Sequence, residues 1–411
     1  MSHRTLAIVG ASMAGAKAAE AARESGYDGR VVLIGDEATA PYERPPLSKA
    51  VLRGEAEPAS TRVHPDGFYD EHDIELVTKR VVGIDGSSRR LALPDGDTLA
   101  FDAAILATGA EPRRLAVPGA ELDGVRYLRS VDDSTRLREA IVAASRVAVI
   151  GAGWIGSEVA ASARQMGADV VLIAPTPVPL GRVLGDEIGE VFRRLHADNG
   201  VQLRLGVGVG ELRGSGGVEE VVLTDGTTEA ADLVVAGIGV TPRTDVAGAG
   251  CGLAVDNGIL ADQHLETNVA AIYAAGDVAN AWHPRYRRHV RVEHWANALN
   301  QGTTAGRNVA GWREVYDRLP YFFSDQYDLG MEYVGLSSAS DELVVRGDLD
   351  AREFVAFWHR DGVVSAAMNV NVWDVVEDLK AIITAGRPID PDRLADPKVD
   401  IGDIVGATSS P

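Results

Sequence analysis

Residues 5–35 read TLAIVGASMAGAKAAEAARESGYDGRVVLIG, and residues 146–174 read RVAVIGAGWIGSEVAASARQMGADVVLIA. In each stretch a short apolar run ends at a glycine, a second glycine follows five residues later, and an alanine-rich run continues to a third glycine. A second apolar run then closes each stretch, at Val31–Ile34 and Val170–Ile173. This order predicts a strand, a tight turn, a helix and a second strand, used twice. We therefore expect an α/β protein with two tandem nucleotide-binding domains.

The first glycine-rich turn predicts a pyrophosphate site. Glycines at the start of a helix let backbone N–H groups and the helix dipole come close to a phosphate. The turn runs from Gly10 to Gly15, and it carries Ser12 where this motif usually has its middle glycine. Serine is small enough to keep the approach open. Asp36 and Glu37 follow the second strand, where a carboxylate can bind a ribose hydroxyl, so we expect this Rossmann-like unit to bind a dinucleotide.

The second glycine-rich turn is complete, with Gly151, Gly153 and Gly156 in the GxGxxG spacing. Its second strand ends at Ala174, and no acid follows directly. A carboxylate at this place would bind a free ribose and repel a 2′-phosphate, so the usual signal for NADH is missing. Arg182 is the nearest cation, eight residues further on. The sequence leaves the choice between NADH and NADPH open.

Three further apolar segments stop abruptly at glycine, at 103–112, 233–244 and 271–280. Each is typical of a strand that is buried on both faces and runs into a ligand-facing loop. Residues 321–411 instead alternate apolar and polar positions and then give a helical run. This pattern predicts a small α+β domain at the end of the chain.

The composition limits the functions that remain. At roughly 100–200 residues per domain, the 411 residues suggest two to four domains. A net charge of −20 argues against binding to nucleic acid or an anionic membrane. The single cysteine, Cys251, excludes an intramolecular disulfide, a CxxC redox pair and an all-cysteine iron–sulfur site. Because the sequence shows no long apolar run and no signal-peptide pattern, we expect a soluble, cytoplasmic protein. We also expect no metal site, since the single cysteine rules out an all-cysteine one.

Four motifs, in this order, carry a resemblance to a known family. They are Pro41–Lys49 (PYERPPLSK), Tyr273–Asp277 (YAAGD), Glu293–Ala298 (EHWANA) and Phe323–Asp328 (FSDQYD). Together with the two glycine-rich units, they make the chain similar over essentially its whole length to the two-dinucleotide-binding-domain flavoproteins. Within this family it resembles the FAD-dependent ferredoxin and rubredoxin reductases of the putidaredoxin reductase type, which supply electrons to cytochrome P450 and dioxygenase systems. Phe323 departs from the pattern, since many relatives have tryptophan there.

The resemblance implies a domain organisation and two sets of binding residues. Residues 1–108 and 242–320 would form a discontinuous FAD-binding domain, residues 109–241 an inserted NAD(P)-binding domain, and residues 321–411 a C-terminal interface domain. The expected FAD-binding residues are Gly10, Ser12, Ala14, Gly15, Asp36, Glu37, Arg44, Pro45, Lys49, Val82, Ala107, Thr108, Gly109, Arg129, Gly276, Asp277, Glu293, His294 and Trp295. The expected NAD(P)-binding residues are Gly151, Gly153, Trp154, Ile155, Gly156, Glu158, Ala174, Arg182, Gly237, Ile238 and Gly239.

The resemblance also implies individual roles. Lys49 would lie near the isoalloxazine, where a cation stabilises the reduced ring, and it would pair with Glu158. These two are the expected catalytic residues. Arg129 would contact the FAD pyrophosphate, Asp277 the ribityl chain, and Val82 the adenine through its backbone.

The implied reaction is hydride transfer from the nicotinamide C4 to the flavin N5, followed by two single-electron transfers to a ferredoxin, expected to hold a two-iron–two-sulfur cluster. Such chemistry needs no protonated histidine, so we expect His294 to be a neutral structural residue. Ferredoxins are generally acidic, and a chain with a net charge of −20 would repel them at long range. We therefore expect the cluster of Arg285, Arg287, Arg288 and Arg291 to form a basic docking rim.

Two other functions stay open. An NADH oxidase or peroxidase would pass electrons to oxygen or peroxide, but such relatives usually carry a reactive cysteine early in the chain, and here none precedes Cys251. A protein similar to apoptosis-inducing factor would use its flavin for structure or signalling. Its nucleic-acid-binding form would need a basic surface, which disagrees with the net charge.

Overall fold

The computed structural model describes residues 4–248 and 251–406, and the chain divides into two compact units. Unit 1 comprises residues 1–45, 58–111 and 240–318, and unit 2 comprises residues 46–57, 112–239 and 319–411. The expected domain bounds stay a prediction, and this division groups two segments differently from them. Residues 46–57 and the C-terminal segment group with the inserted nucleotide-binding domain, because their side chains pack against it.

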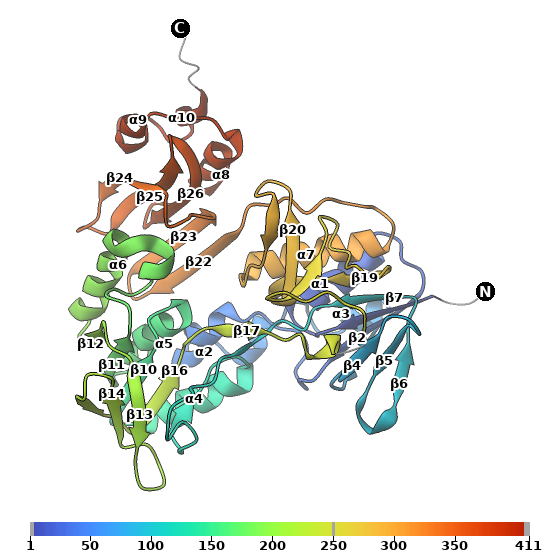
Figure 1. Ribbon diagram of the computed structural model, residues 1–411, viewed down its shortest axis with the longest axis horizontal. Helices are drawn as coiled ribbons and strands as arrows, with labels where there is room; N and C mark the ends of the chain where they lie inside the picture. Colours follow the sequence, from blue (N-terminus) through green and yellow to red (C-terminus); the bar gives the residue numbers. More distant parts are fainter. Residues whose placement is uncertain (1–3, 249–250, 407–411) are drawn as a thin grey trace. The chain divides into compact units, whose positions relative to one another are not determined.

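Unit 1 is built on a five-stranded parallel sheet (Figure 1). In sheet order the strands are β19 (Ile272–Ala274), β7 (Ala103–Leu106), β1 (Thr5–Val9), β2 (Arg30–Gly35) and β3 (Ile74–Thr78). The central strand β1 is apolar and buried along nearly its whole length, as a parallel strand covered on both faces must be. Helix α1 (Met13–Glu24) follows it directly and packs against α7 (Trp295–Val309).

Two small sheets complete unit 1. The first contains β4 (Gly83–Asp85), β5 (Arg90–Ala92) and β6 (Thr98–Ala100). The second contains β18 (Ile259–Ala261), β20 (Ala279–His283) and β21 (Arg288–Val290). Strands β20 and β21 form an antiparallel hairpin that pairs Trp282 with His289. A short helix, α3 (Phe68–Glu71), precedes β3.

Unit 2 repeats the same arrangement in its first part. The strands are, in sheet order, β12 (Gln202–Leu205), β11 (Asp169–Ala174), β10 (Arg146–Ile150), β16 (Leu233–Ala236) and β9 (Val125–Arg126). Strand β10 lies parallel between β11 and β16, just as β1 lies parallel between β2 and β7. This correspondence confirms the repeated strand–turn–helix–strand unit.

Helices and short strands surround this second sheet. The helices are α2 (Ala50–Arg53), α4 (Val131–Ala143), α5 (Trp154–Gln165) and α6 (Gly181–Asp198). A three-stranded sheet contains β13 (Val209–Arg213), β14 (Glu220–Leu223) and β15 (Thr228–Ala230). Where the chain passes from one unit to the other, β8 (Ala110–Pro112) and β17 (Val240–Pro242) pair with each other.

The C-terminal part of unit 2 is the expected small α+β domain. Its antiparallel sheet runs in the order β22 (Tyr321–Gln326), β23 (Leu329–Gly335), β26 (Val363–Val370), β25 (Glu353–Arg360) and β24 (Glu342–Asp348). Helices α8 (Val376–Ala385), α9 (Pro391–Ala395) and α10 (Asp403–Gly406) follow. One face of the sheet shares an apolar core with α6, and the other packs on α8.

The fold class expected from the sequence is confirmed by these elements: two Rossmann-like units and an α+β domain. Across the two described ranges, no helix combines the length and the apolar character that crossing a membrane requires.

Candidate functional site

The glycine-rich turn of unit 1 has the tight backbone that a pyrophosphate site needs. Gly10 has a φ of +115°, and a Cβ there would lie 2.1 Å from the carbonyl oxygen of Ala107. A Cβ at Gly15 would lie 1.9 Å from the carbonyl oxygen of Gly10. Ser12 takes the N-cap position of α1, so the first N–H groups of the helix follow the turn directly. The residues present therefore fit a dinucleotide pyrophosphate at this turn.

The two acidic residues after β2 are held by arginines. Arg243 Nη2 lies 2.8 Å from Asp36 Oδ2, and Arg44 Nη2 lies 2.8 Å from Glu37 Oε1. The Tyr42 hydroxyl also donates to Glu37. Burial by itself raises the pKa of Asp36, but the hydrogen bond and charge of Arg243 outweigh it and hold the pKa below its usual range. Asp36 is therefore ionised and oriented at neutral pH, as a ribose acceptor must be.

The other strand ends of unit 1 are also fixed by hydrogen bonds. The Thr108 hydroxyl donates to the Arg243 carbonyl at 2.6 Å, and the Gly276 N–H donates to Gln301 Oε1 at 2.9 Å. His294 takes the N-cap position of α7, and burial lowers its pKa to about 4, against the opposing charge of Asp277. The imidazole is therefore neutral at pH 7, and the structural role of His294 stays a prediction.

Unit 2 carries the second turn in the same conformation. Gly151 has a φ of +103°, and a Cβ there would lie 2.3 Å from the carbonyl oxygen of Gly237. Gly153, the N-cap of α5, is different, because no described atom lies within 4 Å of a Cβ placed on it. The space in front of Gly153 is therefore open toward the helix N-terminus, and it fits a pyrophosphate. The strand β11 ends at the buried Ala174, and Arg182 is exposed on α6.

Lys49 and Glu158 form a buried ion pair in unit 2. Lys49 Nζ lies 3.0 Å from Glu158 Oε1, and the two side chains are only 10% and 5% exposed. The Ser48 hydroxyl donates to the other carboxylate oxygen, Oε2. The Ser324 hydroxyl donates to Oε1 at 2.7 Å. Burial raises the pKa of the neighbouring Asp325, and the Glu158 charge adds to this, while Lys49 opposes it.

Two known protein families match this chain. The family described as pyridine nucleotide-disulphide oxidoreductase matches residues 4–302. The chain belongs to this family. A second family, described as reductase C-terminal, matches residues 321–405 of the chain. The second match covers the antiparallel sheet and the helices that follow it.

Full-length relatives narrow the assignment within the family. The chain is 37% identical to rhodocoxin reductase of Rhodococcus erythropolis over 97% of its length and 93% of that protein. It is 39% identical to the ferredoxin–NAD(+) reductase component of the anthranilate 1,2-dioxygenase system of Burkholderia cepacia, over 97% of its length and 98% of that protein.

Solved structures agree with these relatives. The ferredoxin reductase for the CYP199A2 system from Rhodopseudomonas palustris has a TM-score of 0.94 and 38% identity, covering 97% of this chain and 99% of that one. The reductase in the covalent putidaredoxin reductase–putidaredoxin complex has a TM-score of 0.94 and 35% identity, with 98% of each chain covered. The expected membership in the ferredoxin reductase branch is confirmed, and with it an oxidoreductase that uses FAD and NAD(P)H.

The expected binding residues are distributed over both units of the chain. Unit 1 holds Gly10, Ser12, Ala14, Gly15, Asp36, Glu37, Arg44, Pro45, Val82, Ala107, Thr108, Gly109, Gly276, Asp277, Glu293, His294 and Trp295. Unit 2 holds Lys49, Arg129, Gly151, Gly153, Trp154, Ile155, Gly156, Glu158, Ala174, Arg182, Gly237, Ile238 and Gly239. Val82 donates its N–H to the Ala92 carbonyl at 2.9 Å, so a backbone contact with adenine would use the Val82 carbonyl. The individual roles stay predictions.

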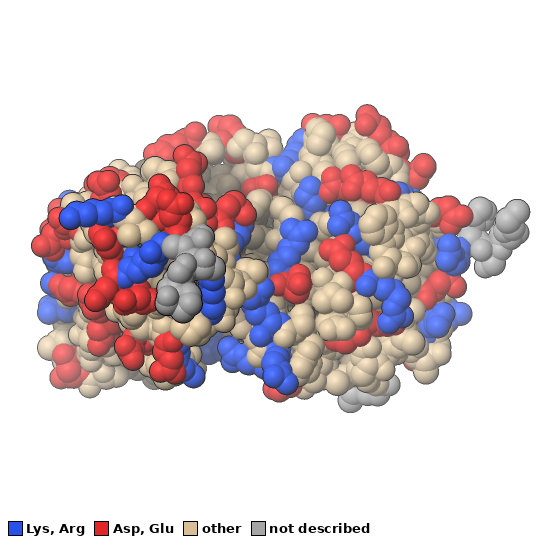
Figure 2. Space-filling view, turned by 90° about the horizontal axis from the view of Figure 1, so that it is seen from above, with Lys and Arg blue, Asp and Glu red and all other residues tan. Residues whose placement is uncertain are grey.

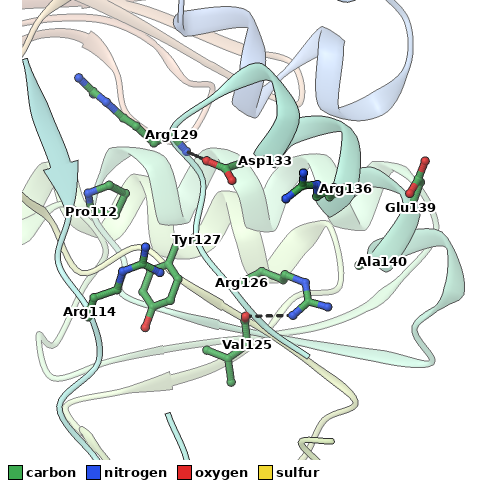
Figure 3. A pocket seen from close by; sticks show the side chains of 10 residues that line it. All are labelled: Pro112, Arg114, Val125, Arg126, Tyr127, Arg129, Asp133, Arg136, Glu139 and Ala140. Carbon is green, nitrogen blue, oxygen red and sulfur yellow. Dashed lines mark hydrogen bonds between the residues drawn. The ribbon is translucent and has the colours of Figure 1, made fainter. Parts of the chain in front are cut away.

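Arg129 lies in a pocket of unit 2 with a volume of about 730 Å³ (Figure 3). The pocket is lined by Pro112, Arg114, Val125, Arg126, Tyr127, Arg129, Asp133, Arg136, Glu139 and Ala140. The Arg114 guanidinium stacks on the Tyr127 ring, 4.2 Å from its centre. The Arg129 N–H donates to Asp133, which caps α4, and the Arg129 side chain extends away from Arg136 (Figure 3). Four arginines, one aspartate and one glutamate line this pocket, and the contact of Arg129 with a pyrophosphate stays a prediction.

The arginine cluster at 285–291 differs from its expected form at one position. Arg285, Arg287 and Arg288 are exposed on the β20–β21 hairpin. Arg291 is mostly buried, with 10% of its side chain exposed, and it pairs with Glu293 at 2.6 Å. Arg291 therefore cannot contribute to an exposed rim. Figure 2 shows that basic side chains form local clusters on a face that also carries many acidic ones.

Sequence reasoning did not single out Arg243, Ser48 or Ser324. Arg243 follows an expected ligand-facing strand, but nothing local shows that it reaches Asp36. Ser48 and Ser324 lie inside the PYERPPLSK and FSDQYD motifs. Those motifs were the available signal, although they do not show that both hydroxyls bind the same carboxylate.

Proposed function

We propose that the protein is a flavoprotein ferredoxin reductase that takes electrons from NAD(P)H and delivers them singly to an iron–sulfur ferredoxin. The observation that carries this proposal is the presence of two dinucleotide turns in a chain that is similar over its full length to ferredoxin reductases. NAD(P)H donates two electrons at once, whereas a ferredoxin accepts one at a time. FAD can connect the two, because it takes up two electrons together and releases them singly.

Unit 1 would hold FAD. The turn at Gly10 offers backbone N–H groups and the α1 dipole to the pyrophosphate. Asp36, kept ionised by Arg243, would accept a hydrogen bond from the adenosine ribose. Asp277, which follows β19, would accept one from the ribityl chain. Each contact uses a polar group at the carboxyl end of a parallel strand, where ligands of open α/β sheets bind.

Unit 2 would hold NAD(P)H at the turn of Gly151 to Gly156. The open space at Gly153 lets the dinucleotide approach the first turn of α5, and this helix also carries Glu158. The Lys49–Glu158 pair would supply a fixed charge distribution close to the reacting rings, as the family resemblance implies. Its burial makes those charges effective, because little water screens them.

The partner would be an acidic ferredoxin, with a two-iron–two-sulfur cluster, that serves a P450 or dioxygenase system. Two relatives support this class, since one is named for an anthranilate dioxygenase system and another is solved in a complex with putidaredoxin. The exposed Arg285, Arg287 and Arg288 would steer such a partner in spite of the net charge of −20.

The experiment that tests this function is a titration with NADH and NADPH while cytochrome c reduction is followed with and without candidate ferredoxins. We expect rapid reduction that depends on both the coenzyme and an acidic two-iron–two-sulfur ferredoxin. Absence of ferredoxin-dependent reduction by FAD-loaded protein would contradict the proposal. Peroxide turnover without ferredoxin would favour the oxidase or peroxidase function instead.

A further inference from the structure

Alternate residues of strand β22 face one side of helix α5. Phe322, Ser324 and Gln326 are buried, as the two-residue period of a strand requires for one face. Trp154 and Glu158 stand four residues apart on α5 and therefore share a face of this helix. The Trp154 and Phe322 rings lie 4.6 Å apart between centroids, and the Ser324 hydroxyl lies 2.7 Å from Glu158 Oε1.

The direction of the Ser324 hydroxyl is set by its other neighbour. Gln326 Nε2 donates to Ser324 Oγ at 3.3 Å. A serine hydroxyl has one hydrogen to donate, so accepting from Gln326 leaves that hydrogen for Glu158. Ser324 and Gln326 are each 1% exposed and Glu158 is 4% exposed, so water does not compete for these groups. The hydroxyl therefore acts as a fixed donor.

Ser324 is one of the donors that determine how the Glu158 carboxylate is turned. Ser48 binds Oε2, while Lys49 and Ser324 share Oε1. Without Ser324, the only donor left to Oε1 among the described residues would be the ammonium of Lys49. The carboxylate could then turn about its last torsion angle, and the ammonium would turn with it.

We propose that Ser324 is a positioning residue for the Lys49–Glu158 pair, so that the C-terminal domain contributes to the reaction with NAD(P)H and not only to partner contact. This inference rests on the proposed function. The support is rigid, because β22 belongs to a five-stranded sheet that packs between α6 and α8. A donor carried by such an element is held more accurately than one carried by a loop.

The test compares Ser324→Ala, Ser324→Cys, Glu158→Gln and the double variant Ser324→Ala/Glu158→Gln with the wild type. Stopped-flow spectroscopy gives the rate of flavin reduction at saturating NADH or NADPH and its dependence on coenzyme concentration. We expect Ser324→Ala to slow flavin reduction roughly tenfold without changing the half-saturating coenzyme concentration, since one hydrogen bond to a charged group is lost. Oxidation of dithionite-reduced protein by ferricyanide should keep its rate. Ser365→Ala, on β26 of the same sheet, is the control.

Two further readouts separate positioning from general damage. In the Glu158→Gln background, Ser324→Ala should have no additional effect, because Ser324 acts through Glu158. In the flavin-free protein, the infrared carboxylate band that Glu158→Gln removes should shift in Ser324→Ala. Additive effects, or an unshifted band, would overturn the proposal.

The remaining outcomes are also decisive. If Ser324→Ala does not fold, Ser324→Cys carries the same expectation, because a thiol is a weak donor of similar size. Wild-type rates in the folded variants would overturn this inference alone. If the wild type with bound FAD is reduced by neither coenzyme, the proposed function fails, and this inference fails with it.

Discussion

Arg243 binds Asp36 across 2.8 Å, although the two residues are 207 positions apart in the sequence. One follows the strand β17 and the other follows β2, and both belong to unit 1. Since Asp36 is the expected ribose acceptor, the arginine prepares it by keeping it charged. The backbone carbonyl of Arg243 also accepts a hydrogen bond from the Thr108 hydroxyl at 2.6 Å. Arg243 therefore connects two ligand-facing loops.

This pair makes a specific contribution to stability that depends on pH. The pKa of Asp36 is lowered in the folded state, so the pair stabilises the fold above the unfolded pKa of about 3.9. The contribution is lost as pH falls through the lower folded pKa. Arg243→Gln should therefore reduce the free energy of unfolding by about 0.5 kcal/mol at pH 7, a small value because Asp36 is partly exposed and screened. Urea unfolding at pH 7 and at pH 3 measures it. A difference that grows in acid would contradict the assignment.

The first and the middle glycine of these turns predict opposite results for substitution by alanine. Gly10→Ala places a Cβ 2.1 Å from the Ala107 carbonyl, so it should destabilise the protein and lower its FAD content. Gly153→Ala meets no described atom within 4 Å, and Gly153 has a φ of −82°, so the fold and the FAD content should be kept. Gly153→Ala should also leave the KM for NAD(P)H nearly unchanged, because the first turn carries a serine at the same place. The branched side chain of Gly153→Val should instead block the pyrophosphate and raise this KM roughly tenfold. Flavin absorbance and steady-state kinetics measure both. An unchanged KM in Gly153→Val would rule out this turn as the coenzyme site.

Much of the fold could be predicted because its signals are local. The expected strands at Val31–Ile34 and Val170–Ile173 lie within β2 and β11, whose observed ends are one residue further out on each side. Apolar runs next to glycine turns are decided by neighbours in the sequence. The alternation after residue 321 likewise predicted the antiparallel C-terminal sheet.

The contacts around Glu158 could not be predicted in the same way. Ser48 and Ser324 reach this carboxylate across 110 and 166 positions of the sequence. No period or spacing encodes such contacts, because they depend on how separate elements pack. The burial of Arg291 was missed for the same reason, since a run of arginines does not show which one turns inward to Glu293.

Removing one member of the buried Lys49–Glu158 pair should cost more stability than removing both charges. Lys49→Met leaves a carboxylate that is 5% exposed without its cation, and we expect the free energy of unfolding to fall by about 3 kcal/mol. Lys49→Met/Glu158→Gln removes both charges and should recover most of this loss. Denaturant unfolding of the two variants and the wild type measures the difference. If both variants are equally unstable, the loss comes from packing and not from the unpaired charge.

The preference for NADH or NADPH should depend on the residue at the end of β11, Ala174. Ala174 places no negative charge where a carboxylate would bind the ribose and repel a 2′-phosphate. Ala174→Glu should therefore lower kcat/KM for NADPH relative to NADH by about tenfold or more. Ala174→Gln is the neutral control of similar size, and it should change the ratio less. Because Ala174 is 2% exposed, thermal unfolding of both variants checks that the larger side chain is tolerated. Equal ratios in all three proteins would show that this position does not contact the ribose.

Charge reversal on the β20–β21 hairpin should weaken electron delivery in a salt-dependent way. Arg287→Glu/Arg288→Glu replaces two exposed cations, so the second-order rate of ferredoxin reduction should fall about tenfold at low ionic strength. The difference should shrink in rising salt, because mobile ions screen charges beyond about 10 Å at 0.1 M. Arg89→Glu/Arg90→Glu, at the β4–β5 hairpin, is the matched control, since Arg89 has a φ of 52° and Arg287 one of 50°. Both double variants change the net charge equally. Stopped-flow rates that fall equally in both would show that total charge, and not this hairpin, governs the encounter.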